Sequence, residues 1–421
     1  METVTITLNG REVSGQQGMT ILDLAKESGL VIPTLCHDPN LAPYGACRIC
    51  IVEDERSGAL MASCVTPIAP GMVINTQSSR VMERRAILVE LMLASHPDSC
   101  PVCDKGNRCQ LRNIASDLGV GLVRLQRIPQ LASIEEVNPF IERDLSKCIL
   151  CAKCIRACED LVCEGALDYL GRGFVSKPAT LGDQPLEKSE CTFCGTCVAM
   201  CPTGAIMEKE KSYRGTSATR VRTICPSCSC GCGISFDVKG GRLVRARPDE
   251  DSPINKGTLC IRGSYGYDFV HNPERLTTPL VKVNGNFEVV SWEEALKLAA
   301  DGFKRIKAAG GPSSLAVLGS SRCTNEDNYL LQRFARCVLG TNNIDNGSRL
   351  YGFAGFGGST KPIGDIEEAQ VILVIGADPT SSAPLVGYAI RRAVRQRGAK
   401  LVVVDPRQTV LASWAHLWLQ P

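Results

Sequence analysis

Cysteine is the residue type in this chain whose number and spacing could support chemistry. The sequence holds 23 cysteines in 421 residues, and all but Cys323 and Cys337 lie before residue 261. Disulfide frameworks are typical of small secreted domains, whereas the opening stretch METVTITLNG has no basic, apolar or twin-arginine export signal. We therefore expect a cytoplasmic protein whose reduced thiols bind metal.

The first set of cysteines has one close pair and two distant members. It consists of Cys36, Cys47, Cys50 and Cys64. This pattern suits a [2Fe–2S] cluster, and Gly45 lets the loop wrap closely around it. A zinc site built from the same four thiolates is the alternative, although zinc knuckles prefer two short pairs.

Three cysteines and a histidine follow in the stretch SHPDSCPVCDKGNRC. Cys100, Cys103 and Cys109 are one thiolate short of a [4Fe–4S] site, and His96 lies four residues before the first of them. A neutral imidazole can bind iron, as it does in Rieske centres. An ordinary surface histidine is the alternative, but the position before a cysteine triplet favours His96 as the fourth ligand. A helix predicted over 79–95 leads into it.

Residues 140–210 contain an internal repeat whose spacing is typical of bacterial two-cluster ferredoxins. Each run has three cysteines on a tight loop and a fourth on the following helix, which faces away and completes the other site. The predicted sets are Cys148, Cys151, Cys154 and Cys201 for one [4Fe–4S] cluster, and Cys158, Cys191, Cys194 and Cys197 for the other. One departure is Glu159, which stands where proline usually follows the run.

A further [4Fe–4S] site is predicted in residues 222–262. Its ligands would be Cys225, Cys228, Cys232 and Cys260. Cys230 lies in the same loop, CPSCSCGCG, and leaves this assignment open by one position. The predicted total is one [2Fe–2S] and four [4Fe–4S] clusters, about 18 iron atoms per chain. Cys163 is also left over, and we expect Cys323 and Cys337 to be packing residues on or near a helix.

The pattern of apolar residues predicts the elements that position these sites. Residues 1–35 are predicted to form a β-hairpin followed by a helix. After residue 275, short apolar runs alternate with helical stretches, the runs at 313–320, 370–378 and 400–406 and the helices at 325–338 and 384–398. This rhythm predicts a parallel sheet covered by helices, with ligand-binding loops after the carboxyl ends of its strands.

The bulk composition gives no reason to expect nucleic acid as a partner, because the net charge is only +3. No apolar run approaches the ~18 residues of a membrane-spanning helix, so we expect a chain that does not span a membrane. No G-x-G-x-x-G motif follows a predicted strand, so we expect no tight NADH site in this chain by itself.

The order of these modules resembles the large iron–sulfur subunit shared by complex I, NAD-dependent formate dehydrogenases and, over residues 1–210, iron-only hydrogenases. In complex I a histidine and three cysteines hold one cluster, and residues 96–109 match that motif. From residue 222 onward, the segments CPSCSCGCG, NKGTLCIRG and GTNNIDN are similar to those of the formate dehydrogenase catalytic subunit.

This resemblance implies an α+β multi-domain fold with five parts. They are a β-grasp [2Fe–2S] ferredoxin domain (1–78), a [4Fe–4S] domain with one histidine and three cysteine ligands (79–135), a two-cluster bacterial ferredoxin domain (136–215), a molybdopterin-oxidoreductase-like [4Fe–4S] domain (216–275) and a partial α/β doubly wound molybdopterin domain (276–421).

The resemblance also implies contacts to a pterin. Arg262 stands where family enzymes often have lysine between cluster and pterin, and Gly376, Asp378 and Asp405 lie in loops that resemble those holding the pterin nucleotide. Against a working centre, Tyr351-Gly352 stands where a metal-binding cysteine or selenocysteine and a histidine are usual, and the chain ends at Pro421. We therefore expect a partial, vestigial pterin domain without molybdopterin guanine dinucleotide and without a catalytic residue.

The function that follows is electron relay within an NAD(P)H-linked oxidoreductase complex. The expected partners are a flavin (FMN) subunit that binds NAD(P)H, a small [2Fe–2S] subunit, and either ferredoxin or a separate catalytic subunit, with electron bifurcation as one form of this. Two alternatives stay open. One is a formate dehydrogenase α subunit with a functional Mo/W–pterin site, and the other is a scaffold whose clusters are structural only.

Overall fold

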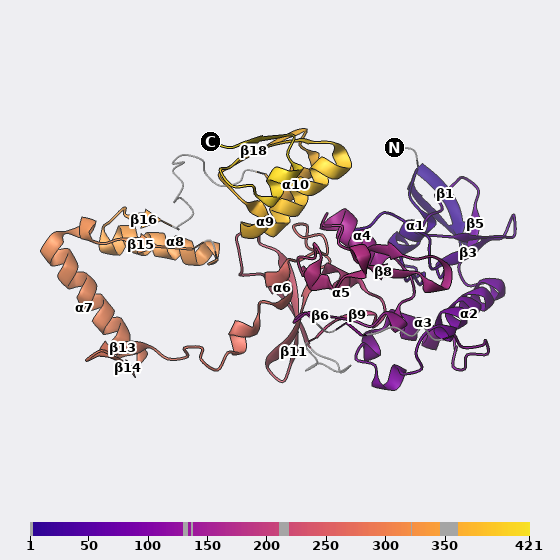
Figure 1. Cartoon of the computed structure of the whole chain (residues 1–421), viewed down its shortest axis with the longest axis horizontal. Coiled ribbons are helices and arrows are strands. Elements are labelled where there is room, and N and C mark those ends of the chain that lie inside the picture. The colour runs from indigo at the N-terminus through magenta and orange to yellow at the C-terminus, as the bar shows by residue number, and fades with distance from the viewer. Residues whose placement is uncertain (1–2, 129–133, 136–137, 210–218, 321, 346–360) are drawn as a thin grey trace.

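The computed structural model describes residues 3–128, 134–135, 138–209, 219–320, 322–345 and 361–421. It is a mixed α/β structure in which the cysteine-rich segments form one continuous body (Figure 1). Residues 276–345 extend away from that body, and the C-terminal unit returns to lie beside its middle part (Figure 1).

The N-terminal unit is a five-stranded mixed sheet with one helix. Its strands are β1 (Thr3–Leu8), β2 (Arg11–Gln16), β3 (Ile51–Asp54), β4 (Ala59–Ala62) and β5 (Val73–Asn75), in the order β2-β1-β5-β3-β4. The predicted hairpin and helix are confirmed, since β1 and β2 pair antiparallel and α1 (Ile21–Glu27) follows. A capping box at Thr20 starts α1. Ile21 and Leu24 then join the core under the sheet.

Two helices carry the next set of predicted ligands. The predicted helix at 79–95 is confirmed as α2 (Ser79–Ala94), which begins at the capping side chain of Ser78. The second helix, α3 (Gln110–Asp117), starts directly after Cys109. Their apolar faces belong to one core that also contains Cys36, Cys47 and Cys151, so three of the predicted sites share a hydrophobic core.

The sequence repeat in the middle of the chain is also a repeat of backbone conformation. Leu150 and Phe193 have φ of 53° and 52°, and two residues later Ala152 and Gly195 have φ of 60° and 76°. A short helix follows each loop, α4 (Lys153–Arg156) in the first copy and α5 (Thr196–Met200) in the second. Strand pairs β6 (Ile141–Arg143) with β9 (Ile206–Glu208), and β7 (Asp168–Leu170) with β8 (Lys177–Ala179), flank these helices.

An antiparallel three-stranded sheet follows the repeat. It is formed by β10 (Thr219–Ile224), β11 (Gly233–Lys239) and β12 (Arg242–Pro248). The short helix α6 (Ile261–Tyr265) begins directly after Cys260 and packs on β12. This arrangement brings the Cys225–Cys232 loop, which joins β10 to β11, close to the body of the molecule.

The extension at 276–345 is built from a hairpin, two helices and a small parallel strand pair. These elements are β13 (Leu280–Val283), β14 (Asn286–Val289), α7 (Trp292–Gly310), β15 (Val317–Leu318), α8 (Asn325–Arg333) and β16 (Ile344–Asp345). The C-terminal unit has the parallel strands β17 (Val371–Ile375), β18 (Lys400–Val404) and β19 (Leu417–Leu419) with helices α9 (Pro379–Ser382) and α10 (Pro384–Arg397). The predicted parallel βαβ rhythm is confirmed for the runs at 370–378 and 400–406, whereas the run at 313–320 forms β15, which pairs with β16 in a separate two-stranded sheet.

Two predictions about residues of this C-terminal part need a comment. Cys323 and Cys337 are exposed, so their prediction as packing residues is wrong. Cys323 precedes α8, which buries no residue, and Cys337 lies in the turn Phe334–Leu339, whose buried residues are Ala335 and Leu339. The pair Tyr351-Gly352, on which the prediction of a vestigial pterin site rests, lies outside the described residues.

Among the described residues of the whole chain, no helix combines the length and apolar character needed to cross a membrane.

Candidate iron–sulfur sites

The repeat at 140–210 encloses two small apolar cavities, and each is lined by one of the predicted cysteine sets. The first cavity is lined by Cys148, Cys151, Cys154 and Cys201, and the second by Cys158, Cys191, Cys194 and Cys197. Each loop of three cysteines is therefore completed by the fourth cysteine of the other run. The structure brings together the sets that the crossed spacing predicted.

These cavities strongly disfavour bare thiolates. Burial raises the pKa of Cys148 to about 11 and that of Cys151 to about 12, and burial of Cys154 raises its pKa well above the ordinary value. At the equivalent positions of the two loops, the backbone N–H groups of Leu150 and Phe193 donate to Sγ of Cys148 and Cys191, both at 3.4 Å. Thiolates in such a place need a bound cation, so the donor set fits iron.

The four cysteines of the N-terminal unit also come together. All four are buried, and the backbone N–H of Cys47 donates to Sγ of Cys36 at 3.4 Å. Thiol hydrogen bonds from Cys47 and Cys64 lower the pKa of Cys36 far below the ordinary value, and the same contacts raise the pKa of both donors. Gly45 has φ of 69° in the loop, as close wrapping requires. The arrangement suits a small cluster held between the loop before β3 and the residues that follow β4.

His96 has the properties that an iron ligand needs. Its Nδ1 lies 3.1 Å from the carbonyl oxygen of Pro97, whereas its Nε2 is buried without a hydrogen-bond partner among the described residues. Burial lowers the pKa of His96, which favours the neutral imidazole. If Nδ1 carries the proton, Nε2 presents a free lone pair inside the protein. Both His96 and Cys103 lie near Lys147, so the histidine and the cysteine triplet occupy one region.

The fifth predicted set, in residues 222–262, is less fully defined. Cys225 and Cys232 are joined by a backbone hydrogen bond of 2.9 Å from the N–H of Cys225, and both are buried. Cys230 is buried too, and its thiol contacts both Cys228 and Cys232. Cys260 is buried as well and lies near Cys194 of the preceding set. The structure thus leaves the choice among the loop cysteines open by one position, as the sequence did.

The predicted ligands in the described part of the chain are not arranged around a single metal ion. Across the described ranges of the chain, no group of three or more His, Cys, Asp or Glu side chains is placed to hold a metal ion as it stands. The cysteines of the repeat line cavities instead, and a cluster with several irons needs such a space between its ligands.

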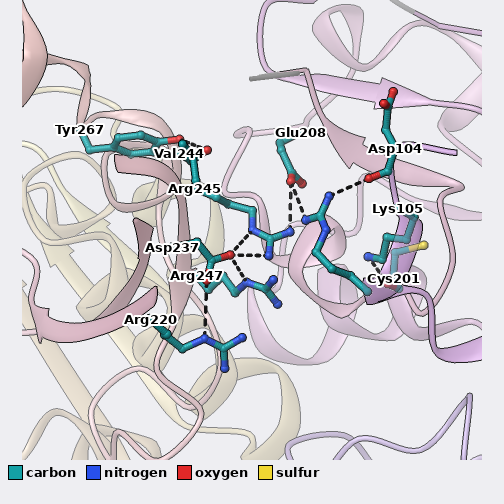
Figure 2. Close-up of polar contacts among 11 residues, drawn as sticks. Asp104, Lys105, Cys201, Glu208, Arg220, Asp237, Val244, Arg245, Arg247 and Tyr267 are labelled. Carbon is teal, nitrogen blue, oxygen red and sulfur yellow. Dashed lines mark hydrogen bonds and ion pairs between the residues drawn. The ribbon is translucent and has the colours of Figure 1, made fainter. Parts of the chain in front are cut away.

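A buried network of charges joins three of the modules. Glu208 Oε1 accepts from Arg108 Nη1 at 3.1 Å and from Arg245 Nη1 at 3.2 Å, and Arg245 Nε donates to Asp237 at 2.9 Å (Figure 2). Arg108 belongs to the His96 segment, Glu208 to β9 of the repeat, and Arg245 to β12. Burial raises the pKa of Asp237 although Arg220 lies beside it. The network fixes how the modules are docked.

Direct contacts link the ligand-bearing segments to one another. Lys105 Nζ donates to the carbonyl oxygen of Cys201 at 2.8 Å, and Arg156 donates to the carbonyl oxygen of Cys36. Ser264 Oγ donates to the carbonyl oxygen of Cys194 at 2.7 Å. Each bond joins the loop of one predicted site to that of the next. Sequence reasoning missed these residues because the cysteine spacing does not specify the residues between or after the ligands.

The predicted pterin-contact residues gather at one edge of the C-terminal sheet. Gly376 and Asp405 directly follow β17 and β18, and the backbone N–H of Gly376 donates to the carbonyl oxygen of Val404 at 2.8 Å. Arg262 Nη2 donates to the carbonyl oxygen of Ser381 at 2.9 Å, in the short helix α9 that follows Asp378. The structure therefore brings Arg262 to the segment that begins at Asp378.

Helix α10 docks the C-terminal unit on the first ferredoxin run. Arg391 pairs with Glu164, and Arg395 pairs with Glu159, the residue that stands where proline was expected. Arg392 Nη2 donates to Glu367 at 2.8 Å within the C-terminal unit, and Arg392 also donates to the carbonyl oxygen of Leu161. The departure at Glu159 thus provides one anchor for the C-terminal unit.

Five protein-family models match successive parts of the chain. They are the 2Fe-2S iron-sulfur cluster binding domain (1–79), the NADH-ubiquinone oxidoreductase-G iron-sulfur binding region (84–124), the ferredoxin-like domain of NADH-quinone oxidoreductase subunit 3 (138–207), the molybdopterin oxidoreductase Fe4S4 domain (218–272) and molybdopterin oxidoreductase (275–421). Their order is the order of domains that the resemblance implied.

Whole-chain comparisons find long relatives. The chain is 37% identical over 432 residues to the NADPH-Fe(3+) oxidoreductase subunit alpha of Geobacter sulfurreducens, covering 99% of this chain and 50% of that protein. It is 32% identical to the G 2 subunit of the NADH-quinone oxidoreductase of Rhizobium meliloti, covering 99% and 49%. A putative formate dehydrogenase of Bacillus subtilis is 31% identical, covering 100% and 48%. The chain spans about half the length of these curated relatives.

Among solved structures, one similar chain comes from the NAD+-reducing [NiFe]-hydrogenase in the H2-reduced state. The match has 29% sequence identity and a TM-score of 0.46, and it covers 49% of this chain and 87% of that one.

Proposed function

We propose that this chain relays electrons in an NAD(P)H-linked complex. It belongs to the group of large iron–sulfur subunits of complex I and formate dehydrogenase-like enzymes, and its last matched part is a molybdopterin-oxidoreductase domain. The observation that carries the proposal is the pair of cavities in the repeat, each lined by a crossed set of four cysteines. When bound, iron–sulfur clusters supply one-electron oxidation and reduction without proton chemistry.

The proposed ligand sets are those of the sequence. A [2Fe–2S] cluster belongs to Cys36, Cys47, Cys50 and Cys64 on a β-grasp fold, and a [4Fe–4S] cluster to His96, Cys100, Cys103 and Cys109. The crossed sets of the ferredoxin repeat take two more [4Fe–4S] clusters. The last [4Fe–4S] cluster belongs to Cys225, Cys228, Cys232 and Cys260. The orphaned Nε2 of His96 and the buried thiols support this assignment.

The contacts between ligand segments suggest an order for the relay. The Cys148 set adjoins both the [2Fe–2S] loop, through Arg156, and the His96 segment, through Lys105. The Cys158 set is next in the order, because the two sets of the repeat exchange their fourth cysteines. Ser264 links the Cys158 set to the Cys260 segment. The proposed order has a branch point at the Cys148 set and one exit toward the C-terminal unit.

The proposed partners are an FMN subunit that oxidises NAD(P)H, a small [2Fe–2S] subunit, and ferredoxin or a separate catalytic subunit. The names of the relatives support an NAD(P)H-linked complex. Because all 23 cysteines are free thiols, we place the protein in the reducing cytoplasm.

For the doubly wound C-terminal unit we propose a docking role without a bis-pterin metal centre of its own. Arg262 and the loop at 376–384 could hold a pterin nucleotide, which is what a formate dehydrogenase α subunit would need. Phenol and glycine at 351–352 offer neither a soft metal ligand nor a proton acceptor. If the purified chain contained stoichiometric Mo or W and reduced a dye with formate, the docking role would be wrong. The chain would then be a formate dehydrogenase α subunit.

The relay is tested by freeze-quench EPR of the anaerobically purified complex mixed with NADPH or NADH. The proposal predicts that reduced-cluster signals assigned to this chain appear within the turnover time of the complex. Signals that never appear with either nucleotide, although dithionite produces them, would leave the clusters as structural elements of a scaffold.

A further inference from the structure

The two cavities of the ferredoxin repeat differ in the charge of their walls. None of the described residues that line the first cavity has a charged side chain, whereas Arg143 and Glu164 both line the second. Arg143 Nε donates to Glu135 at 2.7 Å, so its partner comes from the same part of the body. Glu164 instead pairs with Arg391, which lies 227 positions later on α10 of the C-terminal unit. A distant part of the chain therefore balances one charge of this wall.

Glu164 lies close to the cysteines of the second cavity. The chain turns at Cys163, which has φ of 56°, and the N–H of Glu164 then donates to the carbonyl oxygen of Cys158 at 3.0 Å. Burial raises the pKa of Cys191 to about 11, and the charge of Glu164 contributes to this rise. Burial also raises the pKa of Cys194, again with a contribution from Glu164. The carboxylate thus acts electrostatically on the thiols that line the cavity.

The ion pair between Arg391 and Glu164 is nearly closed to solvent. Only 4% of the Arg391 side chain and 12% of the Glu164 side chain are exposed. Burial raises the pKa of Glu164, and Arg391 opposes that rise, so the pair favours the ionised carboxylate. A guanidinium is charged at any physiological pH, and salt screens buried charges much less than exposed ones. Arg391 therefore brings a permanent positive charge to the wall of the second cavity.

We propose that Arg391 neutralises Glu164 in the wall of the second cavity and thereby raises the reduction potential of the cluster held there by Cys158, Cys191, Cys194 and Cys197. This inference rests on the ligand set of the proposed function. A cluster gains one negative charge when it takes up one electron, so a nearby carboxylate disfavours the reduced state and a nearby cation favours it. Docking of the C-terminal unit then favours electron uptake at the cluster that lies next to the exit.

Helix α10 is held against the repeat by contacts that do not involve Arg391. Arg392 donates to the carbonyl oxygen of Leu161, and Gln396 Nε2 donates to the carbonyl oxygen of Asp160 at 2.7 Å. These bonds fix the helix on both sides of Arg391 in the sequence. A substitution at position 391 therefore leaves other docking bonds in place, and the effect of its charge can be measured separately.

The test is an EPR-monitored redox titration of the full reconstituted chain with dithionite as the reductant. The signal of the cluster concerned is the one that Cys191→Ser alters. In Arg391→Gln we expect the ratio of reduced to oxidised cluster at a fixed potential to fall about tenfold, or about 59 mV for one electron. Glu164→Gln should raise the ratio by a similar factor, because it leaves the guanidinium without its carboxylate. The double variant should return to the wild-type potential.

The matched control is Arg395→Gln on the same helix. Arg395 pairs with Glu159, but 38% and 45% of these two side chains are exposed, so solvent screens the pair. This variant should leave the potential unchanged. Arg391→Lys keeps the positive charge and should also keep the potential near that of the wild type. If Arg391→Gln binds fewer clusters, Glu164→Gln decides the outcome, because it preserves the shape of the side chain in the wall.

The two single variants must shift the potential in opposite directions. An unchanged potential in Glu164→Gln, or shifts of the same sign in both variants, would overturn the inference. Opposite shifts with dithionite would support it even if neither NADPH nor NADH reduced the cluster, a result that would contradict only the relay. A wild-type chain that binds no cluster at the Cys158 set would overturn both the proposed ligand set and this inference.

Discussion

The cysteine-rich body and the extension at 276–345 differ in how far their side chains are buried, since the extension has only a small core around Leu315 and Leu339 among its described residues. In the body, the ligand loops coincide with hydrophobic cores, and one core contains cysteines from three predicted sites. In the extension, α7 and α8 bury no residue, every residue of β14 is exposed, and Trp292 is 67% exposed. In the body, the predicted iron ligands are therefore also part of a hydrophobic core, whereas the helices of the extension are exposed.

The comparison teaches that the two kinds of sequence pattern carry different information. Cysteine spacing specifies a site whose members lie within a few loops, so the site assembles locally. An amphipathic helix such as α7 specifies only that some apolar surface should cover it. Within the described residues, α7 buries no side chain and has one aromatic contact, Phe303 with Phe334 at 6.1 Å between ring centroids. Substitutions in the body should accordingly reduce cluster content or stability strongly, and substitutions in the extension should change both only slightly.

The largest expected effect is the loss of a whole cluster in Cys154→Ser. Cys154 lines the first cavity of the repeat, so its loss should remove about four of the about 18 irons that the full chain binds. The measurement is iron and acid-labile sulfide after anaerobic reconstitution. The matched control is Cys337→Ser in the extension, an exposed thiol that should leave both counts unchanged. Equal losses in the two variants would erase the contrast between the regions.

A smaller effect is expected from the charge network of the body. Glu208→Gln removes the carboxylate that Arg108 and Arg245 share. Arg245 keeps Asp237, and Arg108 keeps the carbonyl oxygen of Asp104. A hydrogen bond to a charged group contributes about 1.5–3 kcal/mol. We expect the visible cluster absorbance to be lost at a clearly lower urea concentration. Glu294→Gln, in the exposed first turn of α7, is the control and should not move the midpoint measurably.

The smallest effect is expected in the extension itself. Trp292→Ser removes a large but exposed apolar side chain, so the free energy of unfolding should change by no more than about 0.5 kcal/mol. Thermal loss of cluster absorbance and sedimentation of the holoprotein provide the measurement. A destabilisation of several kcal/mol would mean that α7 packs against the body in solution, and the comparison between the regions would then fail.

The part of the site that sequence predicts is the part with local spacing. The crossed sets of the repeat and the position of His96 follow from motifs shorter than 20 residues, and the structure brings the crossed sets together. The docking contacts do not follow, because Glu208 joins residues 100 and 37 positions away, at Arg108 and Arg245. Lys105 and Ser264 act across modules in the same way, at positions that the cysteine spacing does not specify.

The part of the fold that sequence predicts is likewise the periodic part. The first hairpin, α2 and the parallel strands β17 and β18 lie at nearly the positions that the apolar pattern predicts. The exposure of Cys323 and Cys337 does not follow from that pattern, because periodicity indicates an apolar face without indicating whether a partner covers it. Burial is set by contacts between distant segments, which one local pattern cannot specify.

The central claim is that this one chain binds five clusters through the proposed sets. Native mass spectrometry of the full chain after anaerobic reconstitution tests it most directly. The account predicts a saturated species that carries one [2Fe–2S] and four [4Fe–4S] clusters, about 18 iron atoms in all. A chain that saturates with about 14 irons, or that binds single metal ions in place of clusters, would contradict it.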